Sequence, residues 1–154
     1  MRYDPKQGLD ATDWNLLNLL RQEARLSFAE LGRKLRLSAP AVAERMKRLE
    51  ERGVIRAYRA EIDLSKLGRG LHVYMRAVVQ PKDYARFRRA VETMDEILEC
   101  YHVTGEESFL LRAAVTAVPS LEALIEKLTA FGPTRTSVIL STSLDRRNFL
   151  PGQR

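Results

Sequence analysis

The stretch that decides the fold of the first half is residues 27–53, SFAELGRKLRLSAPAVAERMKRLEERG. Its opening, Ser27 followed three residues later by Glu30, has the pattern of a capping box, in which two side chains satisfy amide groups at the start of a helix. A short helix is therefore predicted over 28–35, and the chain is expected to turn at residues 36–38.

A second helix is predicted directly after this turn. Ser38 is a favourable N-cap residue, and Pro40 lies in the first turn, where a missing amide hydrogen costs nothing. Gly53 marks the end, because glycine readily adopts the backbone conformation that terminates helices. The sequence therefore predicts a helix over 39–51, and the two helices with their tight turn form a helix-turn-helix.

A further helix is predicted ahead of these two. Residues 10–22 repeat apolar side chains at helical spacing, and Asp10 or Thr12 can cap the start. We expect the three helices to share one apolar core.

The helix predicted over 39–51 has two distinct faces. Its apolar residues Val42, Met46 and Leu49 are spaced at i, i+4 and i+7, a narrow stripe suited to docking on the other helices. The opposite face combines small residues near its start with cations further along, which is the profile of a recognition helix in the major groove of DNA. The predicted DNA-contacting residues are Ser38, Ala39, Pro40, Ala41, Ala43, Glu44, Arg45, Lys47, Arg48 and Arg56.

Positive charge is concentrated in the same region. The formal net charge is +6, residues 1–69 hold 15 lysines and arginines against 10 acidic residues, and residues 33–59 hold nine against three. Such clustering is expected of a protein that binds the phosphate backbone of double-stranded DNA, although a solvated basic surface produces the same count.

The second half of the chain changes pattern. Strands are predicted over 71–80, 97–104, 108–116 and 136–142, and amphipathic helices over 83–94 and 120–131. The order βαββαβ is that of a ferredoxin-like arrangement, an antiparallel sheet with two helices on one face. The predicted fold class is therefore α+β, with a winged-helix-like helix-turn-helix ahead of a ferredoxin-like regulatory domain.

The other face of such a sheet is bare in a single subunit. We expect it to be buried against another copy of the chain, so that the protein is a homodimer or a larger homo-oligomer. The apolar residues predicted for this face are Val73, Met75, Tyr101, Val103, Leu111, Val138 and Leu140.

The chain is predicted to divide into four parts. They are residues 1–56, a helix-turn-helix DNA-binding domain; 57–69, a linker; 70–143, a domain for ligand sensing and oligomerisation; and 144–154, a tail. The run VIRAYRAEID (54–63) reads as a strand, and the glycine-containing segment 65–70 reads as a hinge. The tail is expected to be unstructured or to pack on a neighbouring subunit.

Several classes of protein are disfavoured by the motifs that the sequence lacks. A single cysteine, Cys100, permits no intrachain disulfide, and neither His72 nor His102 has a second ligand at metal-binding spacing, so no metal and no cofactor are expected. No hydrolase or nucleotide-binding motif is present, although an enzyme of ferredoxin-like fold with an added DNA-binding domain stays an alternative. Without a membrane-length apolar run or a secretion signal, a cytoplasmic location is expected.

The chain resembles the Lrp/AsnC, or feast/famine, family of transcription regulators over nearly its whole length. The resemblance rests on LDATDWNLLNLLRQEARLSFAELGRKLRLSAPAVAERMKRLEERGVI (9–55), YRAEIDLSKLG (58–68) and VTGEESFLLRAAV (103–115). It implies that the helix over 39–51 reads DNA and that the ferredoxin-like half binds an amino acid effector. It also implies dimers formed through the sheets, which associate into tetramers or octamers.

The resemblance implies a place for this effector, between dimers and near the loop that joins the second and third strands. This chain departs from the family at Ser108, where an acidic residue usually stands to hold an ammonium group. Glu106 or Glu107 can take over that role, or the effector differs from a standard amino acid. The effector-binding residues carried over are Tyr101, Val103, Thr104, Gly105, Glu106, Glu107, Ser108, Thr134 and Thr136.

Overall fold

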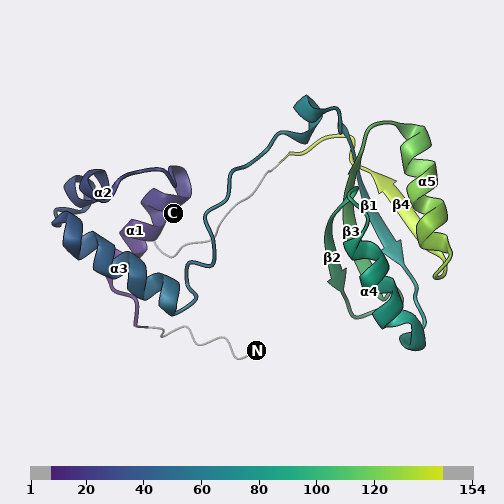
Figure 1. Ribbon diagram of the computed structural model, residues 1–154, viewed down its shortest axis with the longest axis horizontal. Helices are drawn as coiled ribbons and strands as arrows, with labels where there is room; N and C mark the ends of the chain where they lie inside the picture. The colour runs from purple at the N-terminus through teal and green to yellow at the C-terminus, as the bar shows by residue number, and fades with distance from the viewer. Residues whose placement is uncertain (1–7, 144–154) are drawn as a thin grey trace. The chain divides into compact units, whose positions relative to one another are not determined.

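The computed structural model describes residues 8–143, which form two compact units (Figure 1). Of the described residues, 8–60 belong to the first unit and 61–143 belong to the second. The predicted tail over 144–154 lies outside the described residues.

The first unit is built from three helices. They are α1 (Ala11–Gln22), α2 (Phe28–Leu35) and α3 (Ala39–Glu51). Asp10 rather than Thr12 caps α1, because the Asp10 carboxylate accepts an amide of the first turn in a capping box. The capping box predicted for α2 and the Ser38 cap predicted for α3 are both present, so the three predicted helices are confirmed.

The three helices share a small apolar core. Its buried members among the described residues are Leu16, Leu31, Val42, Met46 and Leu49. The last three form the stripe predicted on α3, and this prediction is confirmed. Burial of the stripe leaves the opposite side of α3 at the surface of the unit.

The turn between α2 and α3 depends on two backbone features. Arg36 adopts the left-handed conformation, with a φ of 58°, and ends α2. Gly32 permits a close approach of the turn to α2, because a Cβ atom there would lie 2.5 Å from the Leu37 carbonyl oxygen. Together they bring the start of α3 against the end of α2, as a helix-turn-helix requires.

The strand predicted over 54–63 is wrong, since no residue of this segment lies in a strand. A strand needs a hydrogen-bonded neighbour along its length. Here the amides of Val54 and Ile55 instead donate to the Leu49 carbonyl, at 2.9 and 3.1 Å. The residues after α3 therefore complete the end of that helix.

The segment predicted as a hinge contains a helical turn. A short 3-10 helix, η1, spans Leu64–Leu67, and the Asp63 carboxylate caps it. Gly68 ends this helix in the left-handed conformation, with a φ of 79°, which favours glycine. This segment is therefore structured, and it belongs to the second unit.

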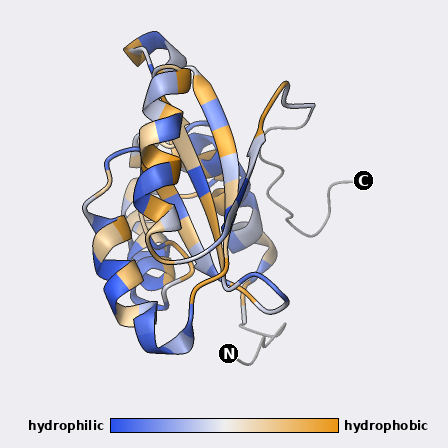
Figure 2. Cartoon of the chain, turned by 90° about the vertical axis from the view of Figure 1, so that its right-hand side faces the viewer, coloured by the Kyte–Doolittle hydropathy of each residue, from blue (hydrophilic) through white to orange (hydrophobic). Residues whose placement is uncertain are grey.

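The second unit is a four-stranded antiparallel sheet with two long helices. Its elements are β1 (Leu71–Ala77), the 3-10 helix η2 (Pro81–Asp83), α4 (Tyr84–Glu92), β2 (Ile97–His102), β3 (Phe109–Val115), α5 (Val118–Thr129) and β4 (Thr134–Val138). The strand order is β2-β3-β1-β4. This confirms the predicted ferredoxin-like arrangement. Apolar and polar residues alternate along the strands and are mixed on the helices, as Figure 2 shows by hydropathy.

Both long helices cover the same face of the sheet. The buried core between them and the strands consists of Val73, Met75, Ala77, Val79, Phe87, Val91, Phe109, Leu111, Ala113, Val115, Leu121, Leu124 and Leu128. The aromatic rings of Phe87 and Phe109 lie 4.6 Å apart between centroids, at the centre of this layer. The sheet is therefore anchored on its helix-covered side.

Part of the predicted composition of the bare face is wrong. The residues assigned to the wrong side are Val73, Met75, Leu111 and Val138. The first three are fully buried beneath the helices, and the last pairs with Val73 across the ladder and shares its side. Tyr101 does lie on the bare face, because it alternates with Cys100, which packs against the core. The bare face is mixed in character and carries Tyr74, Arg76, Glu99, Tyr101, Leu110, Arg112, Arg135 and Ser137.

Candidate nucleic-acid interface and effector loop

The exposed side of α3 presents small residues first and charged residues after them. Three half-buried alanines are followed by two exposed side chains, in the order Ala39, Ala41, Ala43, Glu44 and Lys47. Lys47 is 68% exposed, and its Nζ atom lies 3.8 Å from Oε1 of Glu51. Small side chains permit close approach to a partner, and an exposed lysine can meet a phosphate.

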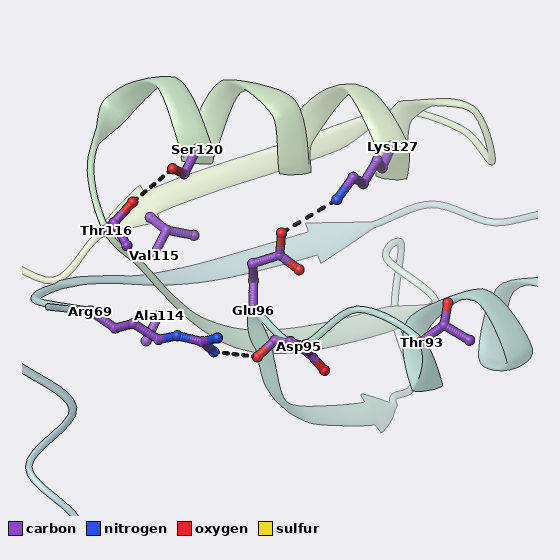
Figure 3. Close-up of a pocket in the computed structure, with 9 residues that line it drawn as sticks. All are labelled: Arg69, Thr93, Asp95, Glu96, Ala114, Val115, Thr116, Ser120 and Lys127. Carbon is purple, nitrogen blue, oxygen red and sulfur yellow. Dashed lines mark hydrogen bonds and ion pairs between the residues drawn. The ribbon is translucent and has the colours of Figure 1, made fainter. Parts of the chain in front are cut away.

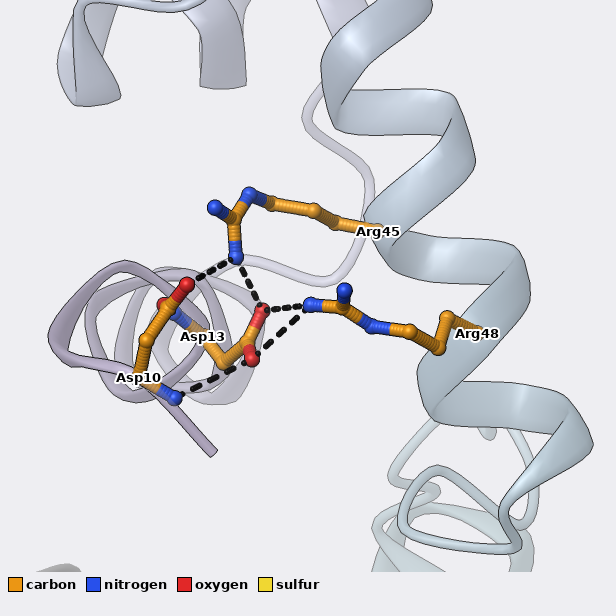
Figure 4. Close-up of polar contacts among 4 residues, drawn as sticks. All are labelled: Asp10, Asp13, Arg45 and Arg48. Carbon is orange, nitrogen blue, oxygen red and sulfur yellow. Dashed lines mark hydrogen bonds and ion pairs between the residues drawn. The ribbon is translucent and has the colours of Figure 1, made fainter. Parts of the chain in front are cut away.

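Two of the predicted DNA contacts, Arg45 and Arg48, reach toward α1 (Figure 4). Nη1 of Arg45 donates to Oδ2 of Asp10 and to Oδ1 of Asp13, both at 2.7 Å. Nη2 of Arg48 donates to both carboxylate oxygens of Asp13 at 3.1 Å. We call these four residues the Asp–Arg cluster.

Asp13 is the centre of the Asp–Arg cluster. Its side chain is fully buried, whereas that of Arg45 is 24% exposed and that of Arg48 is 46% exposed. The Asp10 amide also donates to Oδ2 of Asp13, at 3.2 Å. A buried carboxylate is stable only when cations and donors surround it, and here α3 supplies both cations. The cluster therefore ties the first turn of α1 to α3.

The same contacts shift two acid–base equilibria. The pKa of Asp10 is lowered from its ordinary value, first because the Asp13 amide donates to it and then because Arg45 does. The pKa of Arg45 is raised, because the Asp10 and Asp13 carboxylates stabilise the guanidinium cation. Asp10 and Arg45 therefore stay charged throughout the neutral range.

Asp13 was missed as a functional candidate from the sequence. Two local signals identify it: the spacing of three from Asp10, which fits a capping box, and the spacing of three from Leu16, which places it on the apolar side of α1. A carboxylate on that side needs a cation, but its partners lie 32 and 35 positions away. No local pattern reveals contacts of that separation.

In the described part of the first unit, several exposed cations that have no partner lie close to either end of α3 in the sequence. Among the described residues, the side chains of Arg36, Arg52, Arg56 and Arg59 are exposed and form no ion pair or hydrogen bond. Arg36 lies at the turn before α3, and the other three follow the helix. We call these the partner-free arginines; only Arg56 was among the predicted DNA contacts.

The predicted effector loop forms the turn between β2 and β3. The Val103 amide donates to the Ser108 carbonyl at 3.0 Å, and Gly105 has a φ of 119°, which favours glycine. The Ser108 hydroxyl donates to the Val79 carbonyl at 3.0 Å and accepts the Val79 amide at 3.3 Å. Ser108 thus joins the start of β3 to the chain that follows β1.

The acidic residues of the loop differ in their surroundings. Oε1 of Glu107 lies 4.0 Å from Nη1 of Arg135 on β4. Glu106 is exposed and has no partner among the described residues. Glu106 is therefore the loop carboxylate that is open to a cationic group.

The remaining predicted effector residues are not brought together within one chain. Tyr101 lies on β2, and Thr134 and Thr136 lie on β4, the opposite edge of the sheet. Three inter-strand steps separate these edges by about 14 Å. Tyr101 is also on the bare face, while the threonines pair with Ala77 and Met75 on the covered face. A site containing all three needs more than one subunit.

A surface pocket of about 390 Å³ lies at the C-terminal end of β3 (Figure 3). The effector loop instead precedes that strand. Its lining residues are Arg69, Thr93, Asp95, Glu96, Ala114, Val115, Thr116, Ser120 and Lys127. Nζ of Lys127 lies 3.3 Å from Oε1 of Glu96, and Arg69 donates to the Asp95 carbonyl at 2.7 Å. None of the predicted effector residues lines this pocket.

Membrane-spanning helices and metal-binding clusters are both missing from residues 8–143. No helix in that range has the length and apolar character that crossing a membrane demands. No group of three or more histidine, cysteine or carboxylate side chains in that range is placed to hold a metal ion. Cys100 is half-buried, and burial raises the pKa of its thiol.

Both halves of the chain match known families. Residues 9–56 match winged helix-turn-helix DNA-binding domains, and residues 72–149 match the Lrp/AsnC ligand binding domain. The HTH-type transcriptional regulator LrpC of Bacillus subtilis is 36% identical over 140 residues, which cover 91% of this chain and 96% of that protein. The structure of LrpC matches with a TM-score of 0.85 and covers 90% of this chain and 99% of its own.

Two similar structures hold an amino acid. The feast or famine regulatory protein of M. tuberculosis, complexed with L-methionine, is 32% identical, with a TM-score of 0.84 over 93% of this chain and 99% of its own. A transcriptional regulator of Neisseria meningitidis, in complex with L-methionine, is 27% identical, with a TM-score of 0.84 over 93% of this chain and 96% of its own.

These matches confirm the family resemblance, the fold class and the prediction of a transcription regulator rather than an enzyme. The matched residues lie in both units, so the DNA-binding half and the ligand-binding half each match a family. The chain belongs to the Lrp/AsnC family of DNA-binding transcriptional regulators.

Proposed function

We propose that this regulator binds a pseudo-palindromic DNA site as a homodimer or larger assembly, with α3 of each subunit in the major groove. The observation that carries the proposal is the surface of α3, which presents half-buried small residues at its start and is flanked in the sequence by the partner-free arginines. We assign DNA binding to residues 1–56, the linker role to 57–69, and ligand sensing with oligomerisation to 70–143.

Base recognition is assigned to the first turns of α3. Small side chains there let the helix backbone approach the groove, and the Glu44 carboxylate can accept a hydrogen bond from a cytosine amino group. The Ser38 hydroxyl accepts the Ala41 amide and orients this end of the helix. The base-contacting set is Ser38, Ala39, Pro40, Ala41, Ala43 and Glu44.

Phosphate binding is assigned to the exposed cations. Lys47 on α3 and the partner-free arginines around it have ends that reach solvent. Each cation that neutralises a phosphate releases counterions, so binding must weaken as salt increases. Direct contacts can therefore be counted from the salt dependence of binding.

The test uses the full chain and a genome-fragment selection at fixed moderate salt. On the recovered fragment, Lys47→Gln and Arg56→Gln are compared with wild type across a salt series. Arg88→Gln is the matched control, because it removes an exposed cation from α4 of the second unit. We expect the slope of log affinity against log salt to shrink by about 0.9 for each phosphate that is no longer neutralised, and the control to retain the wild-type slope.

Two outcomes would count against the proposal. Equal slopes for wild type and both α3-region variants, with helical content unchanged by circular dichroism, would remove Lys47 and Arg56 from the interface. Weak, salt-labile binding without any preferred fragment would contradict sequence-specific recognition by the whole protein.

We further propose that an amino acid is the effector of the second unit. Two relatives hold L-methionine, and the loop over 103–108 retains an exposed carboxylate, Glu106, that can bind an ammonium group. One chain keeps Tyr101 apart from Thr134 and Thr136, so the proposed site takes Tyr101 and the two threonines from different subunits. The remaining members of the proposed loop site are Val103, Thr104, Gly105, Glu107 and Ser108.

Thermal unfolding with each standard amino acid tests this assignment. A ligand present at about 100 times its Kd adds about 2.7 kcal/mol to folded-state stability, so the effective amino acid raises Tm. Glu106→Gln should abolish that increase, while Glu122→Gln, an exposed carboxylate on α5, should retain it. A wild type with no increase from any amino acid would contradict the assignment.

The bare sheet face is proposed as the dimer interface. It carries Tyr74, Tyr101 and Leu110 among charged residues, and association buries these side chains. Light-scattering mass on wild type and Tyr74→Glu tests this assignment and separates a dimer from a tetramer or octamer. A Tyr74→Glu mass equal to wild type would exclude this face.

A further inference from the structure

We infer that Arg45 and Arg48 act on DNA only indirectly, as positioning residues that hold α3 in place on α1 through the buried carboxylate of Asp13. The inference rests on the DNA-binding function proposed above. It assigns a different role to two cations that the sequence places on the recognition helix.

The geometry of Arg45 leaves it little freedom to reach a phosphate. One nitrogen atom, Nη1, bridges the carboxylates of Asp10 and Asp13 at 2.7 Å each, and only 24% of the side chain is exposed. Lys47, further round the same helix, is 68% exposed. Neighbouring cations on one helix therefore have opposite environments.

Arg48 is bound to the same carboxylate. It is 46% exposed, yet its Nη2 atom contributes two of the hydrogen bonds on Asp13. Moving either guanidinium toward DNA would remove one of the two cations that pair with Asp13, a carboxylate that has no access to water. Removing one partner from a buried charge costs more than an exposed phosphate contact returns, so the cluster is retained when DNA binds.

The cluster is also neutral as a whole, because two carboxylates compensate two guanidinium groups. Its field at a nearby phosphate is therefore small compared with that of an unpaired cation. Its hydrogen bonds are directional, however, and they join residues 32 and 35 positions apart on two helices. Such contacts resist rotation and sliding of α3, in addition to the packing of its apolar stripe.

If Arg45 and Arg48 position α3, removing the carboxylates should weaken specific DNA binding. If they contact phosphates directly, the same change should strengthen binding. Asp13→Asn keeps the side-chain shape, and Asp10→Asn keeps a good N-cap residue, while each removes one negative charge. Glu23→Gln is the matched control, because this exposed carboxylate at the end of α1 has no partner among the described residues. The full chain is used throughout, on the fragment recovered by selection and on random-sequence DNA.

We expect Asp13→Asn and Asp10→Asn to bind the selected fragment about fivefold or more weakly than Glu23→Gln, the effect of one misplaced base contact. Binding to random-sequence DNA should match that of Glu23→Gln, because the phosphate contacts are intact. Salt slopes should stay at the control value.

Two results would overturn the inference. Tighter binding to both DNAs with a steeper salt slope would show that the freed arginines contact phosphates directly. Affinities equal to the control in the folded variants would show that the cluster contributes stability alone. If Asp13→Asn does not fold, Asp10→Asn decides between these results, since Asp10 is exposed and its replacement buries no unpaired group. A wild type without a preferred fragment would instead overturn the proposed function, and the inference with it.

Discussion

The two units of this regulator orient their helices by different means. Among the described residues, the second unit has a core of thirteen buried apolar side chains, and no charged residue is buried in it. The first unit has five buried apolar core residues and one fully buried carboxylate, Asp13. The smaller core is thus supplemented by directional contacts.

This difference follows from the secondary structure of each unit. A sheet orients its strands through the backbone ladder, and apolar burial is enough to hold two helices against it. A three-helix unit has no such ladder between its elements, and side-chain packing restricts its crossing angles only to preferred values with a scatter of about 15 to 20°. Under the inference above, the Asp–Arg cluster narrows this range, although it adds little net stability.

The largest expected effect comes from breaking the apolar core of the second unit. Phe87→Ala removes a fully buried ring and should lower the free energy of unfolding by about 3 to 5 kcal/mol. Urea denaturation followed by circular dichroism measures this change. Trp14 is the single tryptophan and lies on α1, so its fluorescence follows the first unit separately. A Trp14 transition that moved equally would mean that the units unfold together, contrary to the comparison.

The next largest effect measures how the Asp–Arg cluster contributes to the free energy of unfolding of the first unit. Arg45→Met leaves buried Asp13 with one cation and should cost about 3 kcal/mol, whereas Arg48→Met, at a more exposed position, should cost about 1 kcal/mol. Replacing the buried group as well, with Asp13→Leu added to both changes, should regain most of the stability because no unpaired charge is left. Trp14-monitored denaturation gives all three values; an unrecovered triple variant would show that the ion contacts stabilise the unit by themselves.

A smaller effect tests the turn between α2 and α3, which positions the start of α3. Gly32→Ala places a Cβ atom 2.5 Å from a backbone oxygen and should cost about 2 to 3 kcal/mol. Gly53→Ala is the matched control, with a φ of 66° but open space around it, and should cost about 1 kcal/mol. Both changes should appear in the Trp14 transition, and equal destabilisation by the two would show that close approach at Gly32 is unimportant.

The smallest effect is a pH dependence confined to the first unit. The pKa of Asp10 is lower in the folded chain than its ordinary value of 3.8, so its stabilising contribution is full above that value and is lost as the pH falls below it. Asp10→Asn should flatten the Trp14-monitored stability below about pH 4, where the wild type loses this contribution. An unchanged pH profile in this variant would assign the acid sensitivity to other carboxylates.

Local features of this chain were predictable from its sequence. The helix starts at Ser27 and Ser38 were correct because capping involves residues only three apart. The order of strands and helices in the second half was correct because periods of two and 3.6 residues are visible in short windows. The location of α3 and its apolar stripe followed from the same local rules.

Tertiary structure decided the features that depend on distant partners. Alternation showed which strand residues share a face, but not that the helices cover the face containing Val73 and Met75. The segment after α3 has strand-like composition, yet it finds no neighbouring strand and completes the end of that helix instead. The partners of Arg45 became visible only when α1 and α3 packed together, because a charge on a helix surface acquires its role from whatever the fold places opposite it.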